Sequence, residues 1–353
     1  MKKVLIAGSS GLVGSEAVDF FVKKNFKVYA VDNNLRAFLF GKNSSTLLIK
    51  RFQKDNYSNI KFLNIDITNY NKLEKVFVDN KFDVIIHAAG QPSHDWSAKD
   101  PIFDFRINAY GTLNLLELSR KFCPKTVFIY TSTNKVYGDS PNYLKGLREL
   151  RTRYEVIQNK KLFSVNEKFS IDNSKHSPFG VSKASGDLYV QEYGKYFNLK
   201  TVSFRCGCIT GPNHKGAELH GFLSYLVNCI VNNKNYKIFG YKGKQVRDNI
   251  HASDLVEMFW CFYNNPGFGE IYNAGGGREN SISIIEAINL TKEILSSKWN
   301  NFSIQKKNRS GDHIWYITDY TKFKKKFPYW KLKFSNADII QQIIFELRKI
   351  NSK

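Results

Sequence analysis

Three glycines near the N-terminus have a spacing suited to binding a phosphate group. Gly8, Gly11 and Gly14 follow the apolar run 4–7 and lie where a helical pattern begins at Ser15. In such a strand–turn–helix the first glycine permits the tight turn, the second lets the backbone approach a pyrophosphate, and the third lets the helix pack on the strand. A plain strand–turn–helix without a ligand is the alternative for this loop taken alone.

An acidic residue after the next strand pattern indicates which nucleotide the loop would hold. Asp32 follows the run 26–31, and its carboxylate can accept hydrogen bonds from the adenosine ribose hydroxyls of NAD. The same carboxylate would repel the additional phosphate of NADP, although the nearby Arg36 leaves that cofactor open. We therefore expect NAD, held here by Gly8, Ser10, Gly11, Leu12, Val13, Asp32 and Asn33.

The ends of later strand patterns extend this site. Asp66 and Ile67 end a third strand pattern, where the acid could meet the adenine amino group and a backbone amide its ring. Ala88, Ala89 and Gly90 end a fourth, and their small side chains would let a cofactor lie against the edge where open parallel sheets bind ligands. The fifth pattern ends in the hydroxyls of residues 131–133.

Strand and helix patterns alternate through the first half of the chain, which is typical of an α/β fold. We predict a Rossmann-type, doubly wound parallel sheet over residues 1–206, with an irregular insertion at about 140–175. Turns and short elements follow from residue 207, so residues 207–353 are predicted to form a smaller, mainly substrate-binding domain with segments that return to the sheet.

The composition excludes several other classes of protein. A chain of 353 residues with 42% hydrophobic residues can form a large core, and no apolar run approaches membrane-spanning length. The five cysteines lack metal-like spacing, so we expect reduced thiols, no metal and a cytoplasmic protein. The net charge of +22 could attract nucleic acid, but the lysines are scattered and no nucleic-acid-binding motif accompanies them. We expect neither a nucleic-acid nor a membrane partner.

With these motifs in order, the chain resembles the extended short-chain dehydrogenase/reductase superfamily of nucleotide-sugar epimerases and dehydratases. The resemblance runs from the glycine loop to Asn273 and covers nearly the whole chain. Segments 132–139 and 243–248 are most similar to the CDP-paratose 2-epimerase branch. This implies transient oxidation of a CDP-hexose at C2 by NAD, followed by return of the hydride to the other face, in surface-polysaccharide synthesis. The resemblance adds Asn108, Thr131 and Lys183 to the cofactor contacts.

The chain departs from this superfamily at the catalytic base. The usual tyrosine, four positions before the lysine, is Phe179 here, while Lys183 is retained. A phenyl ring has no ionisable proton, so Phe179 cannot be the acid or base. Three explanations remain open: another group acts as the base, the reaction does not need a tyrosine, or the protein binds a nucleotide sugar without turning it over. His94 is a candidate because its pKa is useful near neutrality, with a surface-loop histidine as the alternative. Thr133 would steady the sugar oxygen. Lys135, Cys206 and Cys208 are further candidates.

The resemblance also implies the substrate contacts and the assembly. Arg247 and Arg309 would bind the diphosphate through paired N–H donors. The alternative for each arginine is a surface salt bridge. The expected substrate contacts are Gln91, His94, Thr133, Asn134, Lys135, Arg205, Asn213, Arg247 and Arg309. Helices over 112–122 and 181–196 would pair two copies into a homodimer. The alternative functions are an NDP-sugar 4-epimerase or dehydratase and a non-catalytic nucleotide-sugar-binding protein.

Overall fold

The structure is a computed structural model that describes residues 1–214, 216, 218, 221–306 and 312–351, and it divides the chain into two compact units. The first unit comprises Met1–Val136, Ser177–Arg205 and Leu255–Tyr272, and the second comprises Tyr137–His176, Cys206–Asp254 and Asn273–Lys353. The irregular segment near 140–175 therefore groups with the second unit, whereas the sequence placed it as an insertion in the first domain.

A seven-stranded sheet forms the centre of the first unit, in the order β13-β9-β5-β4-β1-β2-β3. Neighbouring pairs among β3, β2, β1, β4 and β5 are parallel. The order reverses direction between β1 and β4, which is the switch point where open α/β sheets bind ligands. The Rossmann-type prediction is thus confirmed. The strands are β1 (Lys3–Ala7), β2 (Lys27–Val31), β3 (Ile60–Leu63), β4 (Val84–His87), β5 (Val127–Thr133), β9 (Lys200–Cys206) and β13 (Glu270–Ala274).

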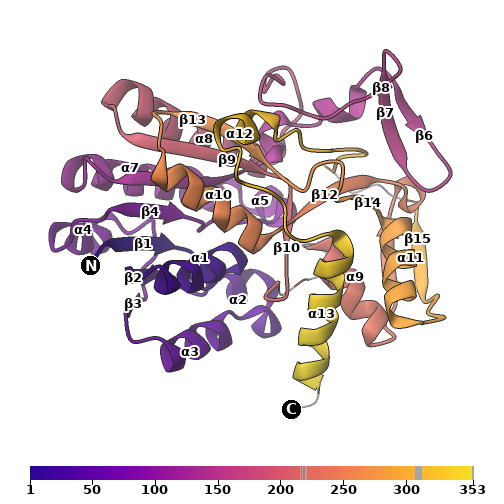
Figure 1. The fold of residues 1–353 in the computed structure, drawn as a ribbon, viewed down its shortest axis with the longest axis horizontal. Coiled ribbons are helices and arrows are strands. Elements are labelled where there is room, and N and C mark those ends of the chain that lie inside the picture. Colours follow the sequence, from indigo (N-terminus) through magenta and orange to yellow (C-terminus); the bar gives the residue numbers. More distant parts are fainter. Residues whose placement is uncertain (215, 217, 219–220, 307–311, 352–353) are drawn as a thin grey trace. The chain divides into compact units, whose positions relative to one another are not determined.

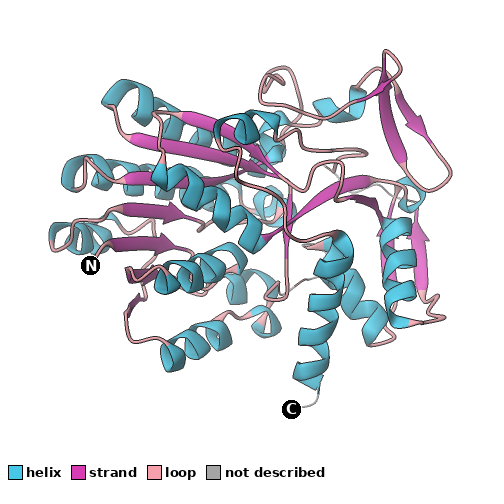
Figure 2. Cartoon of the chain, viewed as in Figure 1, coloured by secondary structure: helices cyan, strands magenta, loops and turns pink. Residues whose placement is uncertain are grey.

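Helices alternate with these strands along the chain and cover the sheet (Figures 1 and 2). Because helices cover both faces, β1 is apolar after its first residue, and Val4, Leu5, Ile6 and Ala7 are fully buried. On one face α7 packs against α4 and α8, and on α1 Phe21 contacts Trp260 of α10. The helices are α1 (Leu12–Lys23), α2 (Leu35–Phe40), α3 (Leu47–Asn56), α4 (Tyr70–Val78), α5 (His94–Lys99), α6 (Pro101–Phe105), α7 (Gly111–Phe122), α8 (Ser177–Phe197) and α10 (Ala252–Asn264).

The second unit has its own core, where α9, α11 and α13 pack together around side chains such as Leu226, Ile288 and Ile340. Helix α11 begins with a capping box in which Ser283 and Glu286 each accept the other's backbone N–H. The helices are α9 (Phe222–Val231), α11 (Ile284–Leu295), α12 (Thr321–Lys326) and α13 (Asn336–Asn351). The strands are β6 (Leu147–Glu149), β7 (Tyr154–Gln158), β8 (Lys161–Leu162), β10 (Cys208–Thr210), β11 (Tyr236–Phe239), β12 (Val246–His251), β14 (Ser281–Ser283) and β15 (Phe302–Gln305).

The described residues lack two kinds of feature. None of their helices combines the length and the apolar character needed to cross a membrane. Within the same residues, no group of three or more His, Cys, Asp or Glu side chains could hold a metal ion.

Candidate functional site

The glycine turn after β1 is closely packed against the end of β4. Gly8 has a left-handed φ of +79°, and a Cβ atom there would lie 2.6 Å from the backbone nitrogen of Ala89. A Cβ atom at Gly14 would lie 1.9 Å from the carbonyl oxygen of Gly8, so the first turn of α1 packs directly on the loop. The left-handed φ of Gly8 agrees with the predicted tight turn, and the contact at Gly14 agrees with the predicted packing of helix on strand. The close approach of Gly8 to the end of β4 was not predicted.

The same turn presents polar groups that suit an anionic ligand. Helix α1 starts after Gly11, and no side chain caps its first N–H groups. The hydroxyls of Ser9 and Ser10 are buried and lack a hydrogen-bond partner among the described residues. Buried polar groups are normally hydrogen-bonded, and a helix N-terminus favours negative charge. The residues of this turn therefore fit the pyrophosphate of a dinucleotide.

Asp32, which follows β2, is joined to the glycine turn. Its carboxylate accepts hydrogen bonds from the backbone N–H of Ser10 at 2.9 Å and of Asn34 at 2.7 Å. Burial raises the pKa of Asp32, and these two hydrogen bonds oppose that shift. Asn33 donates to the carboxylate of Asp66 at 3.0 Å, so residues predicted to hold the adenosine end of NAD lie side by side.

A buried polar network connects the loop after β4 to helix α8. The amide of Asn108, which lies in a π-helical turn, donates to the Gln91 carbonyl at 3.0 Å and to the Ser182 hydroxyl at 3.1 Å. Asp104 accepts from the Gln91 side chain at 2.6 Å and from Ser182. Burial raises the pKa of Asp104, against the hydrogen bonds from Ser182 and Gln91. Gln91 was expected to bind substrate, but its side chain is fully buried and forms part of this hydrogen-bond network.

Lys183 is positioned by the strand end that carries the predicted hydroxyls. Its ammonium donates to the carbonyl of Thr131 at 2.7 Å and lies 4.2 Å from the ring centroid of Tyr130. The hydroxyl of Thr133 accepts from the backbone N–H of Lys135 at 3.2 Å. Burial, together with the charge of Lys183, lowers the pKa of the fully buried His87 well below its ordinary value. Lys183 is thus a buried cation at the carboxyl end of the sheet.

Phe179 lies one helical turn before Lys183 and contacts His94. The Phe179 side chain is buried, and its ring centroid is 4.8 Å from that of His94 in an edge-to-face arrangement. His94 Nδ1 is 3.0 Å from the hydroxyl of Ser177, the first residue of α8. The structure therefore places one sequence-predicted candidate, His94, in contact with the phenylalanine that replaces the tyrosine.

Arg205, another residue expected to bind substrate, has an internal partner. Its guanidinium forms two hydrogen bonds to the carboxylate of Asp187 on α8, at 2.9 and 3.2 Å, and both side chains are buried. Arg205 is therefore an internal partner of Asp187 and not the substrate contact that the resemblance implied. No local pattern in the sequence indicates this pair, because the two residues lie on different elements.

In the second unit, Arg247 on β12 is likewise buried and paired. Its guanidinium contacts the Asp312 carboxylate at 2.6 Å and donates to the carbonyl of His313. Burial raises the pKa of the neighbouring Asp248 to about 6, while its carboxylate accepts from the Gly277 N–H. Asn213 lies in the turn after β10, and Arg309 falls outside the described residues. Asp312 was not anticipated as a partner of Arg247.

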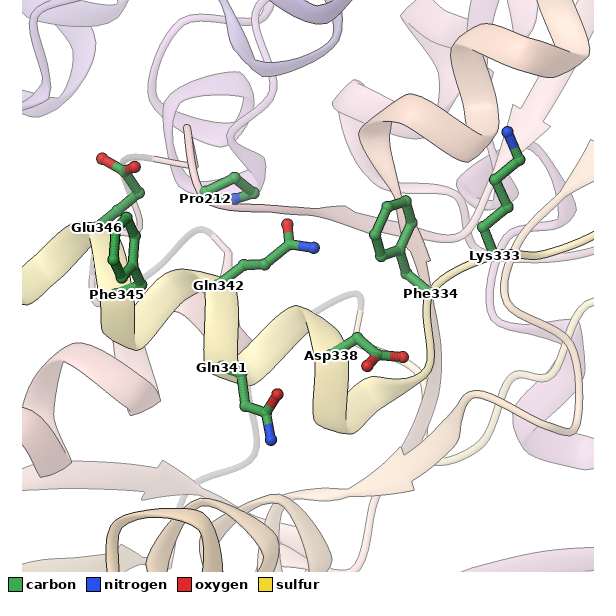
Figure 3. A pocket seen from close by; sticks show the side chains of 8 residues that line it. All are labelled: Pro212, Lys333, Phe334, Asp338, Gln341, Gln342, Phe345 and Glu346. Carbon is green, nitrogen blue, oxygen red and sulfur yellow. The ribbon is translucent and has the colours of Figure 1, made fainter.

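An open pocket of the second unit contains none of the predicted site residues. Figure 3 shows that it runs along α13, with Gln342 pointing toward Pro212 and Phe334 at one end. Gln342 also contacts His251 Nε2 at 3.1 Å. The pocket is lined by Pro212, Lys333, Phe334, Asp338, Gln341, Gln342, Phe345 and Glu346.

Comparison with known proteins supports the same family over most of the chain. Residues 4–275 match the NAD dependent epimerase/dehydratase family. The CDP-paratose 2-epimerase of Salmonella typhi is 30% identical, with 97% of this chain and 98% of that protein covered. A putative UDP-glucose 4-epimerase of Methanocaldococcus jannaschii is 28% identical, with 79% of each chain covered.

Solved structures agree on the fold. A tyrosine-to-phenylalanine mutant of UDP-glucuronic acid 4-epimerase from Bacillus cereus, solved with NAD and a fluorinated UDP-sugar, superimposes with a TM-score of 0.80. The two proteins are 24% identical, and 99% of each chain is covered. The fold, the glycine turn and the family match lead to one conclusion: this chain belongs to the NAD dependent epimerase/dehydratase family, whose members are enzymes that use NAD.

Proposed function

We propose that this protein is a nucleotide-sugar epimerase that inverts C2 of a CDP-linked hexose. The observation that carries this proposal is the 30% identity to CDP-paratose 2-epimerase over nearly the full length of both chains. Six further relatives, which are named for UDP- or dTDP-sugars, match 79–84% of this chain. A match that includes the C-terminal residues favours the 2-epimerase, because substrate specificity in such folds resides in segments added to the dinucleotide-binding sheet.

The first unit carries the groups that would hold NAD. The turn from Gly8 to Gly14 would bind the pyrophosphate, Asp32 the adenosine ribose and Lys183 the nicotinamide ribose. NAD supplies reversible hydride transfer when it is bound. Lys183 brings a positive charge to the end of β5, and the Thr133 hydroxyl, which is half-buried, would orient the sugar oxygen. In the second unit, Asn213 would contact the sugar or the phosphate, whereas the Arg247 guanidinium expected at the diphosphate is already buried against Asp312.

We also propose a homodimer formed through α7 and α8. Val181, Leu188 and Tyr196 are exposed apolar side chains on α8 at intervals of seven and eight residues, which places them on one helix face. Leu188→Glu should therefore weaken self-association. A monomer in gel filtration of the unaltered protein at working concentration would rule this assembly out.

The experiment is proton NMR of the purified protein in heavy water with CDP-, UDP- and dTDP-hexoses, following the stereochemistry at C2 and C4. We expect a new C2 epimer from a CDP-hexose only. Inversion at C4 would identify a 4-epimerase, and loss of water from the sugar would identify a dehydratase. Saturable binding without any product would support the second candidate, a non-catalytic binding protein, which the absence of an ionisable group at Phe179 favours.

A further inference from the structure

We propose that His94 is the acid–base residue of this site and that Ser177 orients it. The proposal rests on the epimerase function proposed above. It concerns the one role that Phe179 cannot fill, which is to take the proton from the reacting sugar hydroxyl and to give it back.

The imidazole packs against the ring that occupies the superfamily's tyrosine position. Phe179 precedes Lys183 by one helical turn, and the edge-to-face contact holds the His94 ring centroid 4.8 Å from the phenyl centroid. The phenyl ring is 7% exposed, so it acts as a packing surface for the imidazole. Histidine is suited to this role because its ordinary pKa lies near neutrality.

Ser177 fixes the orientation of the imidazole. The Ser177 hydroxyl is 3.0 Å from Nδ1 of His94. Ser177 has a left-handed φ of +63°, an uncommon conformation for a residue with a side chain. A serine hydroxyl can accept from Nδ1–H or donate to an unprotonated Nδ1, so this contact orients the ring in either tautomer.

The segment that carries His94 is held rigidly against α8. Helix α5 begins at His94, with Ser93 capping it through the Trp96 N–H at 3.3 Å. Upstream, Gln91 is fully buried and is joined through Asp104 to Ser182, the residue before Lys183. These bonds hold the backbone that carries His94 against α8, and such support is what a group that transfers protons needs.

His94 would move the proton of the reaction. As the O–H bond at C2 breaks, its proton would pass to the His94 imidazole, and bound NAD would supply the hydride acceptor for the C2–H bond that breaks with it. The ketone would then rotate to present its other face. When the C2–H bond forms again on that face, His94 would return the proton to the oxygen, so no net oxidant is consumed.

Other candidates fit the role less well. His87 is fully buried, and its Nε2 contacts Thr112 at 2.9 Å. Its pKa is lowered well below the ordinary value, so it resists protonation. Lys183 already donates to the Thr131 carbonyl. Thr133 is too weak an acid to act without a partner.

The first test compares His94→Ala and His94→Gln with Lys99→Gln, a control at the exposed end of the same short helix. We expect both His94 variants to lose about 10²- to 10⁴-fold in turnover, the usual contribution of a general acid or base. Lys99→Gln should retain the rate. Added imidazole should restore about tenfold or more of the His94→Ala rate, because it can occupy the space of the deleted ring. Near-normal turnover in His94→Ala, or a loss that imidazole does not repair, overturns the assignment.

The second test does not depend on turnover. The seven histidines are labelled with ¹³C, and the His94 ring signal is assigned by its disappearance in His94→Gln. This signal should shift when a CDP-hexose is added and should shift less with CDP alone. Identical signals in the two complexes would remove His94 from the site. If no nucleotide sugar binds at all, the proposed function fails together with this assignment, whereas turnover that persists without His94 overturns the assignment alone.

Discussion

Replacing Gly8 by alanine should separate two physical effects that meet in the glycine turn. The new side chain would have to adopt φ +79°, which costs a residue with a Cβ atom about 1–2 kcal/mol. It would also lie 2.6 Å from the Ala89 nitrogen and 2.7 Å from the Ala88 carbonyl carbon. Both are backbone atoms that cannot rotate away, so we add about 1–3 kcal/mol for overpacking.

Gly41→Ala is the matched control. Gly41 has a similar left-handed φ of +85°, but no atom lies within 4 Å of the position of its Cβ atom. Its ψ of 170° places it in a region almost confined to glycine, so its substitution should lower the free energy of unfolding by the conformational cost alone, about 1–3 kcal/mol. The difference between the two variants measures the clash with the end of β4.

The assays are urea unfolding without NAD and titration of NAD by calorimetry. We expect Gly8→Ala to lose about 1–3 kcal/mol more than Gly41→Ala, with a weakening of NAD binding by about tenfold or more, which corresponds to 1.4 kcal/mol. Gly41→Ala should bind NAD normally. Equal losses of stability in the two variants, or unchanged NAD affinity in Gly8→Ala, would refute the close approach of the two backbone segments as the basis of this site.

Three further predictions concern buried groups. Arg205→Ala should lower the free energy of unfolding by about 3–5 kcal/mol, because the Asp187 carboxylate is left buried without its cation; an effect below 1 kcal/mol in urea would contradict this. Phe179→Tyr should retain NAD and lower turnover, because the added hydroxyl must fit against His94, whereas a higher rate would show that the phenol is the missing base. The pKa of Asp248 is raised by burial to about 6, so folding takes up a proton between about pH 4 and 6, and the carboxyl's contribution to stability falls as the pH rises through that window. The difference in free energy of unfolding between Asp248→Asn and the unaltered protein should therefore shift in favour of the variant by about 3 kcal/mol from pH 3.5 to pH 7. Parallel denaturant titrations measure this difference, and a difference that does not change with pH would contradict the raised pKa.

The sequence was informative where chemistry depends on short spacing. The turn around Gly8 and the one-turn separation of Phe179 from Lys183 are local patterns, and the structure shows the close approach and the helix face that they imply. Alternating strand and helix patterns were enough to predict the doubly wound sheet, because parallel strands buried on both faces are apolar throughout.

The sequence was least informative where function depends on partners distant along the chain. Arg205 looked like a substrate residue, since nothing local indicates that Asp187 faces it across the helix–strand contact. Gln91 is part of a network with Asp104 that only the folded chain assembles. The contact between His94 and Ser177 joins residues separated by 83 positions, and no periodicity predicts it.

The hydrogen bond between Asp32 and Ser10 has a consequence for how cofactor preference could evolve or be engineered. Under the proposed assignment, the carboxylate that would distinguish NAD from NADP also anchors the backbone of the loop that would bind the phosphates. Changing Asp32 to a neutral or basic residue would remove that anchor at the same time as it admits the larger cofactor. A switch of preference therefore requires a second, compensating change near Ser10, and single substitutions at this position lead through intermediates that bind both cofactors poorly.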